Sequence, residues 1–136
     1  MRGFSRIHAW IYRASGGRLA TRTAQGYPVL LLLTRGRRSG KPRTTPLAYF
    51  EDDGRWVICG GSGGTATHPQ WFRNLRADPN VSVQIEDRHH TVRAREADGS
   101  ERDELWPKAC AALPLVAEYQ RQVERRVPVV VLEPVV

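Results

Sequence analysis

The chain has 136 residues, of which 40% are hydrophobic and 26% are charged. This is the size of one ordinary domain, so we predict a single domain over residues 1–136. No unbroken apolar run, Pro28 to Leu33 included, is nearly long enough to span a bilayer. Basic residues interrupt every apolar stretch among the first fifteen positions, so no signal peptide is predicted and we expect a soluble, cytoplasmic protein.

The formal net charge of +7 favours an anionic partner, which could be nucleic acid, lipid or a phosphorylated small molecule. The two cysteines, Cys59 and Cys110, are far apart and form no metal-type spacing or disulfide framework. The four histidines show no metal spacing either. We therefore predict two reduced thiols and no metal site.

An amphipathic helix is predicted near the N-terminus. Phe4, Ile7, Ile11 and Ala14 recur at steps of three and four residues, and Ser15-Gly16-Gly17 would end the helix. The helix either packs on the rest of the domain or frays, or it acts as a lid or contacts a membrane surface. Membrane contact would place the protein at the inner face of the membrane. We treat residues 1–25 as this helix and its lead-in.

The remaining residues, 26–136, predict an α+β fold with an antiparallel sheet. Asp53-Gly54 is a strong hairpin signal, and a second turn falls at residues 86–88. The pattern lacks βαβ alternation, which favours an antiparallel barrel over a doubly wound sheet. Six strands are expected at 28–33, 44–50, 55–59, 81–85, 91–96 and 127–132, with inserted helices at 69–76, 101–113 and 115–125.

The basic segment Thr34 to Thr45 carries five positive charges and two glycines between two predicted strands. Glycines let backbone N–H groups turn towards an anion, and Arg offers a rigid fork that matches phosphate oxygens. The alternative is a solvated hairpin tip whose charges only protect a sheet edge. The charge pattern is consistent with both a phosphate site and a solvated tip, so both alternatives stay open at this point.

A glycine-rich segment, Gly60 to Thr65, follows a predicted strand and leads into the helix at 69–76. Its backbone can approach a flat ligand closely. On the helix, Trp71 could cover a ring system, and Asn74 could bind a phosphate or a backbone carbonyl. The alternatives are a flexible loop and an aromatic side chain that belongs to the core.

Three motifs occur in order: Arg-Gly-Arg-Arg-Ser-Gly-Lys-Pro-Arg at 35–43, Gly-Gly at 63–64, and His-Pro-Gln-Trp-Phe-Arg-Asn-Leu at 68–75. With these motifs the chain resembles the deazaflavin-dependent nitroreductase family. The likeness continues through 77–81, the helices between 101 and 119, and the closing segment 126–134. It covers nearly everything after residue 25.

The resemblance implies a split β-barrel of the flavin-binding kind that holds coenzyme F-420, an 8-hydroxy-5-deazaflavin with a ribityl phosphate and an anionic polyglutamate tail. FMN remains the alternative cofactor, because related split barrels use it. By similarity the phosphate would contact Arg37, Arg38, Arg43 and the amides of Gly36, Ser39 and Gly40, while the ring system would contact Thr45, Pro46, Gly61, Ser62, Gly63, Gly64, Trp71 and Asn74.

The implied reaction transfers a hydride from the reduced cofactor to an electrophilic acceptor such as a quinone, a nitroaromatic or an activated double bond. Gly61 stands where the nitroreductases typically have serine, and Leu113 and Val116 stand where they typically have tyrosine. Tyr119 alone remains as an acceptor-side candidate, and no residue is assigned a certain catalytic role. A more apolar acceptor, such as a quinone, fits these changes better than a nitroimidazole.

Two other functions stay open at this point. The altered acceptor side would also suit a protein that binds or sequesters the cofactor without turnover. A small basic nucleic-acid-binding module is the third hypothesis, although a cofactor phosphate and polyglutamate tail remove the need for nucleic acid as partner. Related barrels often pair, so a homodimer is also considered.

Overall fold

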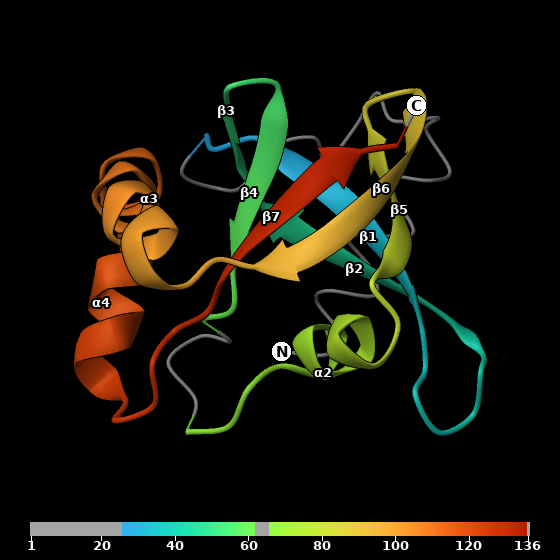
Figure 1. Cartoon of the computed structure of the whole chain (residues 1–136), viewed down its shortest axis with the longest axis horizontal. Helices are drawn as coiled ribbons and strands as arrows, with labels where there is room; N and C mark the ends of the chain where they lie inside the picture. The colour runs from blue at the N-terminus through green and yellow to red at the C-terminus, as the bar shows by residue number, and fades with distance from the viewer. Residues whose placement is uncertain (1–25, 62–65, 136) are drawn as a thin grey trace.

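The computed structural model describes residues 26–61 and 66–135. It is a curled, antiparallel seven-stranded sheet with three helices, so the α+β class is confirmed (Figure 1). The strand order is β2-β1-β5-β6-β7-β4-β3. The elements are β1 (Val29–Arg35), β2 (Pro42–Ala48), β3 (Phe50–Asp52), β4 (Arg55–Cys59), α2 (Gln70–Ala77), β5 (Asn80–Ile85), β6 (Arg88–Glu96), α3 (Gly99–Ala112), α4 (Leu115–Gln122) and β7 (Val129–Pro134).

The predicted count of six strands is wrong by one, because the segment 44–50 forms two strands that meet at Tyr49. Ala48 pairs with Val29 of β1, whereas Phe50 pairs with Val57 of β4. β2 and β3 thus lie at opposite edges of the sheet although they follow each other in the chain. A chain can join the two edges so directly only if the sheet curls, and this curl is consistent with a split barrel. The predicted N-terminal helix lies outside the described residues.

The hairpin between β3 and β4 turns on Asp53 and Gly54, as predicted. Their φ angles are 52° and 75°, and two positive φ values are what a type I′ turn requires. β5 and β6 form the second predicted hairpin, with Ile85 opposite Arg88. The three helices begin and end within about three residues of their predicted bounds.

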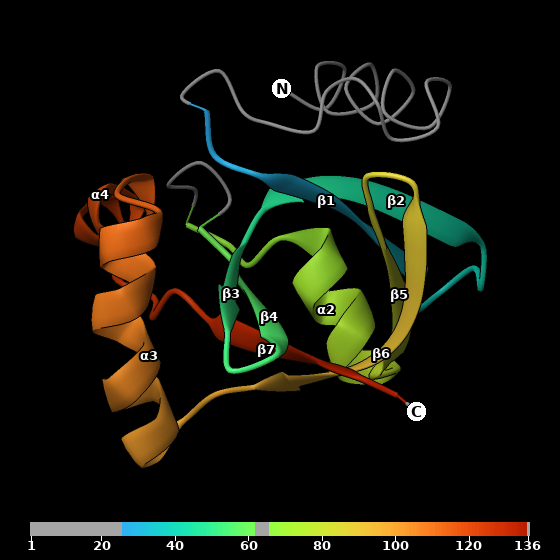
Figure 2. The same cartoon turned by 90° about the horizontal axis from the view of Figure 1, so that it is seen from above.

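Strand β1 is buried on both faces, which explains its unbroken apolar sequence. Leu30 and Leu32 contact the main core cluster, whereas Val29 and Leu31 form a small cluster on the other face. Helix α2 lies within the curl of the sheet and adds Phe72, fully buried, to the main cluster (Figure 2). This packing fixes α2 beside β1 and beside the loop that follows it.

Helices α3 and α4 cover a different part of the sheet (Figure 1). Leu105 of α3 packs with Val57, Val129 and Val131, which lie on the face of β4 and β7 turned away from the main core. Among the described residues, no helix is both long and apolar enough to cross a membrane.

Candidate functional site

The basic loop between β1 and β2 is closed by its own backbone. Gly36 N donates to Lys41 O at 2.8 Å, and Gly40 N donates to Gly36 O at 2.8 Å. Gly40 has a φ of 69°, a conformation that glycine adopts without strain. A β-carbon on Gly36 would lie 2.8 Å from Ser39 Oγ, so a side chain there would require the Ser39 hydroxyl to move. The glycines therefore make a compact loop.

Arg37 joins this loop to helix α2. The Oδ1 atom of Asn74 accepts a hydrogen bond from Arg37 N at 3.2 Å and another from Arg37 Nη1 at 3.0 Å. Arg37 Nη1 also donates to Gln70 Oε1 at 2.8 Å. Asn74 is only 5% exposed, so these bonds fix the loop to an element that belongs to the core. The structure thus brings Arg37 and Asn74 together, and both belong to the predicted cofactor site.

Two other arginines of the predicted site, Arg38 and Arg43, are exposed. Within the described part of the chain neither has an ion-pair partner. The amides of Gly36, Arg37 and Gly40 are engaged in the bonds above, whereas those of Arg38 and Ser39 have no hydrogen-bond partner among the described residues. Two exposed guanidinium groups and two available N–H donors on a braced loop fit a phosphate.

The two predicted ring-binding residues of β2, Thr45 and Pro46, lie on opposite faces of the strand. Thr45 pairs with Leu32 and Pro46 pairs with Leu31, and directly paired residues point to the same face. Thr45 therefore shares the face of the main core cluster, to which Trp71 belongs, and Pro46 lies on the other face. Trp71 is 6% exposed, so it belongs to the core. A planar ring on one face of β2 can contact only one of these two side chains.

A second group of polar contacts holds the chain where β4 ends. Arg125 donates to Gly60 O at 3.0 Å and to Gly61 O at 3.1 Å. Its Nη1 also lies 3.1 Å from His68 Nδ1. A guanidinium can only donate, so Nδ1 is the acceptor and the neutral ring carries its proton on Nε2. Arg125 thus connects the end of β4 with the residues that precede α2.

The same arginine influences the protonation of His68. Burial lowers the pKa of His68, and the positive charge of Arg125 lowers it further. Burial also lowers the pKa of Arg125. His68 is therefore a neutral hydrogen-bond acceptor at neutral pH, which suits a role in holding the backbone.

The acceptor-side candidate Tyr119 lies against Gly61. A β-carbon on Gly61 would lie 2.5 Å from Tyr119 Cδ2. Leu113 and Val116 are 5% and 6% exposed and pack with Val127 in a separate core cluster. Their apolar character therefore serves helix packing, and Tyr119, half-buried, is the member of this set that contacts the end of β4.

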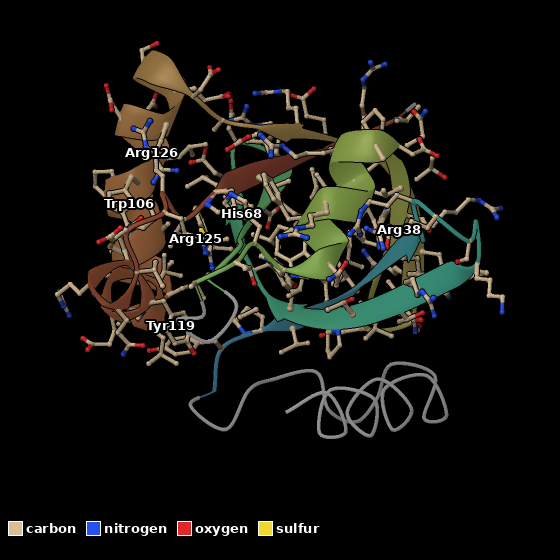
Figure 3. All side chains as sticks on the ribbon, turned by 90° about the horizontal axis from the view of Figure 1, so that it is seen from below. Arg38, His68, Trp106, Tyr119, Arg125 and Arg126 are labelled. Carbon is tan, nitrogen blue, oxygen red and sulfur yellow. The ribbon has the colours of Figure 1, made fainter. Side chains whose placement is uncertain are left out.

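The two groups of site residues lie on opposite sides of α2. Figure 3 shows Arg38 on one side of this helix and Tyr119 on the other. Ser62, Gly63 and Gly64 of the predicted site fall outside the described residues. Within residues 26–61 and 66–135, no group of three or more His, Cys, Asp and Glu side chains is arranged to hold a metal ion.

The sequence patterns predict no role for Arg125, Gln70 or His68. Gln70 and His68 lie within the motif at 68–75, but only the structure reveals their contacts with distant residues. For Arg125, the available signal was a pair of arginines directly before an apolar strand, because a charge in that position must find partners on neighbouring elements.

Comparison with known proteins connects this arrangement to a cofactor. A family model described as F420H(2)-dependent quinone reductase matches residues 4–134. An F420H(2)-dependent quinone reductase of Mycobacterium tuberculosis is 34% identical over 137 residues, which cover 93% of this chain and 87% of the relative.

Two solved structures are similar as well. One, an F420-H2 dependent reductase, is 40% identical with a TM-score of 0.71 and covers 78% of this chain and 94% of that chain. The other, described as a domain-swapped dimer, is 36% identical with a TM-score of 0.73 and covers 92% of this chain and 98% of that chain.

The fold and the family together define a deazaflavin-dependent oxidoreductase, as the sequence predicts. The chain belongs to the F420H(2)-dependent quinone reductase family. Its cofactor is coenzyme F-420, and these relatives give no support to FMN.

Proposed function

We propose that this enzyme passes a hydride from reduced coenzyme F-420 to a quinone. The names of its relatives specify quinone as the acceptor. The observation that carries the proposal is the basic loop, whose exposed Arg38 and Arg43 stand on a backbone that Asn74 fixes to α2. An anchored phosphate defines where the rest of a cofactor can lie.

The phosphate would be held by the guanidinium groups of Arg38 and Arg43 and by the amides of Arg38 and Ser39. Arg37 would act indirectly, because its guanidinium is already bonded to Gln70 and Asn74. Charge-assisted hydrogen bonds contribute about 1.5–3 kcal/mol each, so two arginines can supply a large share of micromolar binding.

The deazaflavin, when bound, supplies the hydride from its C5 carbon. The protein's part is to orient the two reactants and to exclude water. On the cofactor side we assign the ring contact to Thr45, which shares the face of the cluster that contains Trp71. On the acceptor side, Tyr119 and the backbone of Gly61 would border the acceptor, and Arg125 would keep that backbone in place.

The binding test is a fluorescence titration of the protein with oxidised F-420 and, separately, with FMN. We expect tight binding of F-420 and a loss of affinity of at least tenfold for Arg38→Ala and Arg43→Ala. Arg88→Ala removes the same charge from an exposed position on β6 and serves as the control. Preference for FMN, or an equal loss in the control, would refute the phosphate assignment.

The turnover test follows the absorbance of reduced F-420 with a menaquinone analogue and with a nitroaromatic compound. Faster oxidation with the quinone is the expected result. Tight binding without oxidation by either acceptor would instead identify a cofactor-sequestering protein. The two experiments together separate the cofactor assignment from the acceptor assignment.

We also propose that the enzyme acts in the cytoplasm, and that it can form a homodimer. The second proposal rests on the similar chain that is described as a domain-swapped dimer. Sedimentation velocity at several protein concentrations tests it, because a monomer at all of them would exclude a stable dimer.

A further inference from the structure

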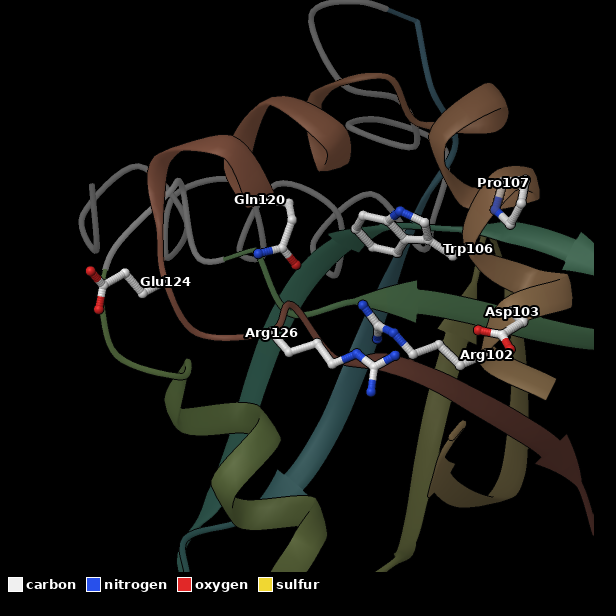
Figure 4. A pocket seen from close by; sticks show the side chains of 7 residues that line it. All are labelled: Arg102, Asp103, Trp106, Pro107, Gln120, Glu124 and Arg126. Atoms are coloured by element: carbon white, nitrogen blue, oxygen red, sulfur yellow. The ribbon is translucent and has the colours of Figure 1, made fainter. Parts of the chain in front are cut away.

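A pocket lies away from the basic loop, between α3 and the segment that connects α4 to β7 (Figure 4). It has a volume of about 450 Å³, which is within the range of small-molecule sites. Arg102 and Trp106 of α3 line one side, and Arg126 lines the other. None of these residues takes part in the proposed reaction.

Arg102 is a buried charge that, among the described residues, is attracted by Glu96 and Asp103 but forms no salt bridge with either. The residue is 5% exposed, and its Nη1 donates to Val127 O at 2.7 Å. Its guanidinium carbon lies 4.8 Å from the centre of the Trp106 ring. Across the described residues it forms no ion pair. A buried guanidinium of this kind is costly unless an anion compensates its charge.

A second positive charge faces the first. Figure 4 shows the guanidinium groups of Arg102 and Arg126 converging on the same part of the pocket. Burial lowers the pKa of Arg102, and the charge of Arg126 lowers it further. The carboxylates of Asp103 and Glu124 also line the pocket, but neither forms an ion pair with either arginine, and Figure 4 shows Glu124 pointing away from both.

The backbone around Arg126 is fixed in advance. The side-chain amide of Gln120 donates from Nε2 to Arg125 O at 2.8 Å and accepts at Oε1 from Val127 N at 2.8 Å. With the bond from Arg102 to Val127 O, three hydrogen bonds hold the residues on either side of Arg126. A site that is ordered before binding loses less entropy when a ligand arrives.

We propose that this pocket binds the oxyanion group of a small molecule, a phosphate or a carboxylate, between Arg102 and Arg126. The anion would neutralise two like charges that otherwise repel each other, and guanidinium groups match both kinds of oxyanion. The size of the pocket and its distance from the basic loop make this a second site, separate from the one proposed for the cofactor phosphate.

The test uses the indole N–H signal of Trp106 in NMR spectra, assigned by its loss in Trp106→Phe. Inorganic phosphate and succinate are titrated separately at constant ionic strength. We expect a saturable shift of this signal with at least one of the two, and the tighter one identifies the class of ligand. Arg126→Ala should weaken that binding at least tenfold, and Arg126→Lys should weaken it less.

Two control variants make the result specific. Arg88→Ala removes an exposed charge elsewhere, and Arg38→Ala removes a charge from the basic loop, so both should leave the titration of the Trp106 signal unchanged. The absence of any shift with both anions would overturn the proposal. So would an equal weakening in Arg126→Ala and Arg88→Ala, because that would indicate attraction by net charge alone. Arg126 is exposed, so its replacement should not prevent folding.

Discussion

The α-carbon of Gly61 lies directly against the ring of Tyr119. A β-carbon on Gly61 would lie 2.5 Å from Tyr119 Cδ2, so no side chain fits at position 61 unless the ring moves. We predict that Gly61→Ser forces the tyrosine ring to move. Overpacking of this kind lowers the free energy of unfolding by about 1–3 kcal/mol. Urea denaturation measures the loss, and the KM for the quinone should rise because Tyr119 borders the proposed acceptor site.

A double-mutant cycle checks the cause. Tyr119→Ala removes the ring, so Gly61→Ser should cost far less stability in that background. Tyr119→Phe keeps the ring and removes only the hydroxyl, so in that background the full cost should remain. Equal costs in all three backgrounds would show that the contact with Tyr119 does not constrain position 61.

Asn74 is predicted to act through the loop that it holds. Asn74→Ala leaves Arg37 N without its acceptor, and the free energy of unfolding should fall by about 1–2 kcal/mol. The loop loses its link to α2, so the affinity for F-420 should fall as well, by about tenfold, which corresponds to 1.4 kcal/mol. Calorimetric titration with F-420 measures this change.

The matched control for Asn74 is Gln70, on the same helix. Gln70→Ala removes an exposed bond to the same Arg37 side chain and leaves the backbone bond intact. It should therefore change affinity and stability much less. Asn74→Asp keeps an acceptor in place and should retain most of the affinity. A larger effect for Gln70→Ala than for Asn74→Ala would contradict the proposed role.

The elements of this fold could be predicted because their signals are local. Asp53-Gly54 specifies its turn through its own backbone preferences, and the apolar run of β1 reports burial on both faces. The division of β2 from β3 at Tyr49 could not be read in this way. It depends on which strands flank each half, and the one proline of the segment, Pro46, lies within β2 and not at the break.

For the candidate site, too, the sequence predicts the local features but not the contacts between distant residues. Local charge and glycine content indicate the basic loop between β1 and β2. The bond from Arg37 to Asn74 joins residues 37 positions apart, and Arg125 lies 65 positions from Gly60. Such partners are set by the packing of α2 and by the position of β7. Leu113, which the sequence assigns to the acceptor side, packs with Val116 and Val127, and only the structure shows this packing.

His68 should titrate below its ordinary range. Burial and then the charge of Arg125 lower its pKa, so the folded state favours the neutral ring. Stability from this group is fully present above the unfolded pKa of about 6.5 and falls as the pH drops through the lower folded value. NMR titration of the ring protons measures the pKa, and Arg125→Gln should raise it. A pKa at or above 6.5 in the wild type would contradict this account.

Thr34 offers a route to higher stability. Its hydroxyl is buried, and among the described residues it has no hydrogen-bond partner. Thr34→Val keeps the shape and removes the unsatisfied group, so the free energy of unfolding should rise by about 1 kcal/mol. Thr44→Val, on the neighbouring strand and half-buried, is the control and should change stability little. A loss of stability in Thr34→Val would show that the hydroxyl has a partner after all.

Acid sensitivity should arise from the ion pairs between α3 and the sheet. Glu101 binds Arg95 through both carboxylate oxygens and also contacts Arg55 at 3.3 Å. Hydrogen bonds from Arg95 are the main cause of the lowered pKa of Glu101, and on β3 a hydrogen bond from Lys108 similarly lowers the pKa of Asp52. A lowered carboxyl pKa stabilises the fold above the unfolded pKa of about 4.3, and this contribution is lost as the pH falls through the folded value.

Glu101→Gln removes this contribution, and at pH 7 it should lower the free energy of unfolding by about 1 kcal/mol, because the group is partly exposed and screened by solvent. The difference in unfolding free energy from the wild type should shrink between about pH 5 and pH 2, because the carboxylate of Glu101 gains its proton in roughly this range. Glu51→Gln, at an exposed position on β3, should show no such difference. Urea denaturation across this pH series distinguishes the ion pairs from a general effect of net charge, since both substitutions change the charge equally and only Glu101 is bonded to arginine.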